Sequence, residues 1–84
     1  MLSNKELLLR ELRDQLARAD DLVQRGEKEL QCILYELNNS NVNIFNIAYQ
    51  LEATREKYNE DVKRRDVIIE NIKLVENYVF KEST

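Results

Sequence analysis

The chain has no proline, histidine or tryptophan, and only one glycine and one cysteine among its 84 residues. Compact domains with several elements use glycine and proline at their turns, so this scarcity favours a few long elements. Without histidine no Ser-His or Cys-His pair is available for catalysis, and Cys32 alone cannot supply a zinc site. We therefore predict a non-enzymatic protein that binds no metal or cofactor, with Cys32 a free thiol in a reducing compartment.

The chain also lacks a large excess of charge of one sign and any long apolar run. Charged residues make up 35% of the chain, yet the formal net charge is only −3, so the two signs are mixed. Nucleic-acid-binding proteins usually carry a basic surface, whereas the one basic run, residues 63–65, lies between Asp61 and Asp66. No apolar stretch approaches the roughly 18 residues of a membrane span. The composition predicts an intracellular, cytoplasmic protein that binds no nucleic acid and inserts into no membrane.

One apolar heptad register runs through the whole chain. With position a at Leu2, eleven of the twelve a positions up to Val79 are apolar or aromatic, and no skip is needed. A spacing of 3.5 residues keeps the a and d residues, which we call the seam, facing a partner helix. The predicted fold is therefore an all-α coiled coil. It forms one segment, residues 1–84, and is helical from about residue 4 to 80. The a and d residues predicted to form the oligomer interface are Leu9, Leu12, Leu16, Val23, Gly26, Leu30, Ile33, Leu37, Ile44, Ile47, Leu51, Tyr58, Ile68, Ile72 and Val75.

Defects in the seam indicate the direction of pairing. In a parallel homodimer Gly26, Asp61 and Arg65 each meet their own copies, which leaves a void and buries like charges. In an antiparallel pair whose facing residue numbers sum to 84, the bulky Tyr58 meets Gly26, and Arg65 extends past Ala19 to water. An antiparallel register in which the facing residue numbers sum to 91 also forms good charge pairs. The pattern therefore predicts an antiparallel coiled coil and leaves its register open.

The centre of the chain is rich in asparagine. Residues 38–43 read Asn-Asn-Ser-Asn-Val-Asn, and asparagine is a weak helix former that tolerates turn conformations. Two arrangements share the same contacts: two continuous helices of about 120 Å lying antiparallel, or a hairpin that turns at 38–43. We expect the continuous helix, because Ile44 and Ile47 continue the seam in phase. The alternative hairpin buries little by itself and is expected to assemble into a four-helix bundle.

A second apolar group lies outside the seam, near the centre of the chain. This candidate partner patch consists of Tyr35, Val42, Phe45 and Tyr49. An apolar patch on the back of a coiled coil is a candidate docking site, although it also fits the interior of a larger bundle.

The heptads resemble rod segments of cytoskeletal, centrosomal, kinetochore or membrane-traffic scaffolds. The predicted function is a structural scaffold that self-associates as a homodimer and holds partners at a fixed spacing. A tetramer is the alternative oligomeric state. The alternatives are an adaptor that binds a partner through the central patch, and a subunit of a heteromeric complex with other helical proteins.

Overall fold

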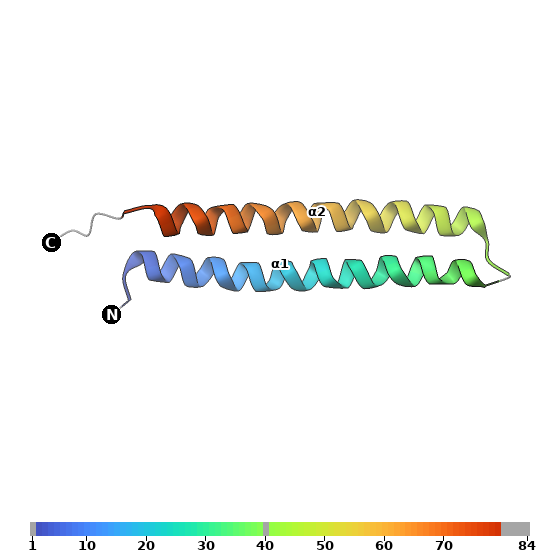
Figure 1. The fold of residues 1–84 in the computed structure, drawn as a ribbon, viewed down its shortest axis with the longest axis horizontal. Helices are drawn as coiled ribbons and strands as arrows, with labels where there is room; N and C mark the ends of the chain where they lie inside the picture. The colour runs from blue at the N-terminus through green and yellow to red at the C-terminus, as the bar shows by residue number, and fades with distance from the viewer. Residues whose placement is uncertain (1, 40, 80–84) are drawn as a thin grey trace.

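The computed structural model describes residues 2–39 and 41–79. It is an antiparallel hairpin of two long helices (Figure 1). Helix α1 spans Asn4–Tyr35, a short 3-10 helix η1 spans Glu36–Asn38, and helix α2 spans Ile44–Asn77. The principal extents are 70 × 18 × 13 Å, and the described residues include no strand. The predicted all-α class with antiparallel helices is confirmed.

The chain turns at the asparagine-rich centre, so the alternative hairpin is formed and the expected continuous helix is not. The backbone leaves the helical region at Asn39 (φ −86°, ψ 129°) and is extended again at Asn43 (φ −87°, ψ 104°). The Asn43 side chain then accepts a hydrogen bond of 3.3 Å from the Asn46 N–H and caps α2. The break falls within the predicted residues 38–43, of which residue 40 lies outside the described residues.

The two free ends of the hairpin are tied together by a lysine in the seam. Lys5 occupies a d position, where it is a poor apolar knob. Its Nζ donates to the carbonyl oxygens of Glu76 (2.9 Å) and Tyr78 (3.3 Å) at the end of α2. These carbonyls lack helical partners, and a cation is favourable at a helix C-terminus. At the start of α1, Ser3 Oγ accepts a hydrogen bond of 3.2 Å from the Glu6 N–H and caps the helix.

The core follows the a and d rows of the two helices. A cluster of buried side chains is formed by Leu12, Ala19, Ile68 and Ile72, with Leu9, Leu16 and Val75 packed against it. Val23, Ile33 and Ile47 are the other buried apolar side chains among the described residues. The a and d residues of α1 therefore pack against those of α2 in the same chain.

A contact between Gly26 and Tyr58 fixes the register. A Cβ atom added at Gly26 would lie 2.9 Å from Tyr58 Cδ2, because the tyrosine ring fills the space that the glycine leaves. Tyr58 Oη donates to Glu27 Oε1 at 3.1 Å, and this hydrogen bond, with a smaller contribution from desolvation, raises the pKa of Tyr58 above its ordinary value. The facing residue numbers sum to 84, so the alternative register of 91 is not the one adopted.

The arginine at an a position also finds an oppositely charged partner. Arg65 Nη1 lies 3.7 Å from Asp20 Oδ1, and Arg65 Nε lies 3.7 Å from Asp66 Oδ1. The head of the side chain meets Asp20 beside the seam and is only 29% exposed, so it does not extend freely past Ala19 to water as was expected. Arg65 Nε is buried without a hydrogen-bond partner. Arg65 is thus the least well satisfied residue of the seam.

We predict that Gly26→Ala lowers the free energy of unfolding by about 1 kcal/mol. Alanine gains about 1 kcal/mol in helix propensity, but displacing the Tyr58 ring costs about 2 kcal/mol by overpacking. Urea unfolding followed by circular dichroism measures the change. In a Tyr58→Leu background the same substitution should stabilise the hairpin. Stabilisation of the wild-type background would contradict the contact.

The raised pKa of Tyr58 predicts a dependence of stability on alkaline pH. The pKa of Tyr58 in the folded chain lies above its ordinary value of 10.0. The stability contributed by its hydrogen bond is therefore fully present below about pH 10 and is lost as the pH rises through the folded pKa. Tyr58→Phe should therefore show a shallower fall in unfolding midpoint above about pH 10 than the wild type. Tyr49→Phe, whose ring is exposed, is the control. Equal slopes for wild type and Tyr58→Phe would refute this prediction.

Candidate interaction surface

The predicted oligomer-interface residues pair the two helices of one chain. They close the seam from Leu9, packed on the core cluster at the free ends, to the buried Ile33 and Ile47 near the turn. Beyond that point the seam opens, because Leu37 and Ile44 flank the break and remain 50% and 61% exposed. At the turn end, the predicted interface therefore leaves two of its a residues exposed.

The hairpin brings the candidate partner patch to its turn end (Figure 1). Tyr35, Phe45 and Tyr49 are 76%, 89% and 74% exposed, whereas Val42 in the loop is half-buried. Tyr35 and Tyr49 occupy f positions, which lie opposite the seam, so their rings project from the outer sides of α1 and α2. We call this candidate partner patch the turn-end patch; it is an apolar tip rather than one flat surface.

A second exposed apolar surface flanks the seam toward the free ends. We call it the lateral face; it consists of Leu8, Leu22, Val67, Leu74 and Tyr78. Leu22 is half-buried, and the others are between 41% and 69% exposed. All five lie at g or c positions, which border the same side of an antiparallel pair. The predicted patch did not include these residues, although their g and c spacing is legible in the sequence.

A groove runs between the helices on the lateral face. It has a volume of about 410 Å³ and is lined by Gln15, Arg18, Ala19, Leu22, Arg64 and Ile68. Residues from both helices border one opening, so the g and c rows of α1 and α2 do share a face. The floor is apolar and the rim carries two guanidinium groups. Such a groove fits an apolar or aromatic side chain.

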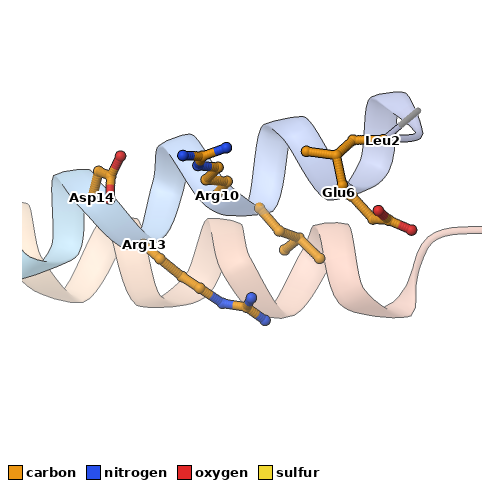
Figure 2. A pocket seen from close by; sticks show the side chains of 6 residues that line it. Leu2, Glu6, Arg10, Arg13 and Asp14 are labelled. Carbon is orange, nitrogen blue, oxygen red and sulfur yellow. The ribbon is translucent and has the colours of Figure 1, made fainter.

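A larger hollow lies against the first turns of α1. It has a volume of about 650 Å³ and is lined by Leu2, Glu6, Leu9, Arg10, Arg13 and Asp14 (Figure 2). Figure 2 shows the charged side chains spread along the helix and pointing in different directions. A catalytic site needs its groups within hydrogen-bond reach of one another. The hollow therefore brings no acid, base or nucleophile together.

The described ranges, residues 2–39 and 41–79, contain no group of three or more histidine, cysteine, aspartate or glutamate residues arranged to hold a metal ion. None of their helices combines the length and the apolar character needed to cross a membrane. Cys32 is an exposed free thiol.

Comparison with known proteins gives no relative: the chain matches no protein-family model, no curated protein and no solved structure. The fold and surfaces define a helical hairpin with two apolar surfaces outside its seam. The turn-end patch and the lateral face are therefore the candidate functional surfaces.

We predict that Tyr35→Ser combined with Tyr49→Ser changes the free energy of unfolding by less than about 0.5 kcal/mol, as exposed substitutions usually do. Both rings are about three-quarters exposed, so little packing is lost. Thermal unfolding of the dilute protein measures the effect. Ile33→Ser is the matched control, because Ile33 is buried nearby and its loss should cost about 3 kcal/mol. A cost of that size for the tyrosine pair would place the patch in a core.

Proposed function

We propose that the chain is a non-enzymatic assembly module, a helical hairpin that self-associates into a four-helix bundle. As a scaffold unit it would hold partners at a fixed spacing. The observation that carries this proposal is the amount of apolar surface that the hairpin leaves in water.

The imbalance between buried and exposed apolar residues supports self-association. The core of the described residues contains seven buried apolar side chains, while thirteen large apolar side chains are at least 41% exposed. Proteins that stay monomeric rarely expose large apolar patches, and covering such a surface stabilises by about 25 cal/mol per Å². A second hairpin laid on the first provides this cover without a change of fold.

The architecture of two helices also favours a second layer. Each helix of a two-helix hairpin buries only one stripe, and stable domains usually pack two layers around one core. Four antiparallel helices in two hairpins are a common solution to this shortage of core. The seam within each chain is retained, and the lateral surfaces become internal.

An adaptor function is the second candidate. The specific observation is the turn-end patch, in which Phe45 is 89% and Tyr49 is 74% exposed. Aromatic side chains are enriched at protein interfaces, so this tip suits a partner helix from another protein, as in a heteromeric scaffold. We also propose a cytoplasmic location, because the exposed thiol of Cys32 is preserved in a reducing compartment.

Sedimentation equilibrium across a concentration series tests self-association. We expect the mass to rise from the 10.0 kDa of one chain to twice that value between about 1 μM and 1 mM, the range of a weak to moderate complex. A folded chain that stays at the monomer mass would refute self-association and leave the adaptor function. A poorly folded chain would favour a subunit completed by other proteins.

A further inference from the structure

We infer that a second copy of this chain docks antiparallel on the lateral face, with a two-fold axis at the level of Gln15 and Asn71. This inference rests on the proposed self-association and specifies its face and register. In the assembly α1 lies on α1 of the second copy, α2 lies on α2, and the two turn ends point in opposite directions.

Four of the five residues of the lateral face are arranged symmetrically about this level. On α1, Leu8 and Leu22 each lie seven residues from Gln15, so Leu8 meets Leu22 of the second copy. On α2, Val67 and Leu74 lie four and three residues from Asn71, so these two meet across the same axis. At the axis itself, Gln15 and Asn71 meet their own copies. The pattern therefore pairs apolar with apolar and amide with amide.

The centre of the apolar pattern on α1, Gln15, and the centre of the pattern on α2, Asn71, lie at the same level of the hairpin. The contact between Gly26 and Tyr58 sets the register in which facing seam residues sum to 84. In that register the flanking g residues Gln15 and Asn71 lie beside each other. One axis therefore relates the apolar residues of α1 and those of α2 to their copies.

Charge complementarity favours the antiparallel arrangement of hairpins. Glu11 and Arg18 occupy one exposed row of the face, and within the chain Arg18 Nη2 lies 3.9 Å from Glu11 Oε1. The two-fold axis sets Glu11 against Arg18 of the second copy, and the reverse pair forms on the other side. With the turns at the same end, Glu11 would instead face Leu74 and Arg18 would face Val67. That arrangement desolvates two charges without a partner, which is costly.

The lateral groove accepts side chains from the second copy. Leu22 and Arg64 line its end, and by symmetry this level meets Leu8 and Tyr78 of the second copy. A tyrosine ring beside the Arg64 guanidinium forms a favourable cation–π contact. The groove is thus occupied by a leucine and an aromatic ring, as its apolar floor and basic rim suggest.

The area of contact predicts a weak dimer. The overlap runs for about 33 Å along the helices, and the hairpin is 18 Å wide. These dimensions give about 1,200 Å² over both copies, near the lower limit for a specific interface. The two turn-end patches then lie about 60 Å apart, at opposite ends of the assembly. The scaffold spacing of the proposed function would be this distance.

Charge reversal in separate copies tests the face and the direction together. Arg18→Glu and Glu11→Arg should each weaken the homodimer about tenfold, because each creates two repulsive contacts across the axis. An equimolar mixture of the two variants should regain wild-type affinity as a heterodimer. The contact between Glu11 and Arg18 within one chain cannot produce this recovery, because each chain keeps its own substitution. Lys28→Glu and Glu56→Lys, at f positions, are controls that should leave the affinity unchanged.

Each result decides a different part of the proposal. A wild-type dimer that neither variant weakens would overturn the lateral face and leave self-association standing. Weakening without recovery in the mixture would overturn the antiparallel register. A wild-type chain that stays monomeric at all concentrations would overturn the proposed function and this inference together.

Disulfide trapping gives an independent measurement of direction. With Cys32→Ser, Gln15→Cys should crosslink two copies of the same variant rapidly, because Gln15 lies at the axis. Ala17→Cys is the matched control, because position b lies on the other side of the helix, and it should crosslink slowly. Preferred crosslinking of Gln15→Cys to Asn71→Cys in a mixture would overturn the inference, because that pair meets only when the turns lie at the same end.

Discussion

The Tyr58 ring packed against Gly26 is the contact on which the rest of the hairpin depends. It sets which turn of α1 faces which turn of α2, because the ring occupies the space left by Gly26, the one glycine of the sequence. A shift of one heptad would set Gly26 against Arg65 and part Arg65 from Asp20, which it reaches at 3.7 Å. The hydrogen bond from Tyr58 to Glu27 holds the ring from its far side. The register is therefore determined by interlocking shapes more than by the apolar repeat.

The same register organises the surface. Gln15 and Asn71 lie at one level only when Gly26 faces Tyr58, and the apolar residues of the lateral face are arranged about that level. The seam holds one chain together, and the lateral face is proposed to join two. In this account the turn-end patch, with Phe45 89% exposed, remains outside both interfaces. Assembly and partner binding would then use separate parts of a short rod.

The sequence predicts the seam, its direction and the exposure of the patch rings, because a regular repeat and its defects report on packing. It predicts a continuous helix where the structure has a hairpin, since both arrangements use the same a and d contacts. The decision depends on how the backbone behaves at Asn39 and Asn43. The contacts of Lys5 could not be predicted from the sequence either, because its partners are backbone carbonyls at the end of α2 and not a side chain. The g and c spacing of the lateral face is visible in the sequence, but which residues of α1 and α2 lie at the same level depends on the register that Tyr58 sets.

The distance between the two helix ends of one chain tests the hairpin most directly. Spin labels on Asn4→Cys and Asn77→Cys, with Cys32→Ser and a large excess of unlabelled protein, report that distance within single chains. The hairpin predicts a separation of about 20 Å or less, because adjacent helices pack 8–10 Å apart. A distance of about 110 Å, the length of 73 helical residues, would show a continuous helix and contradict the account.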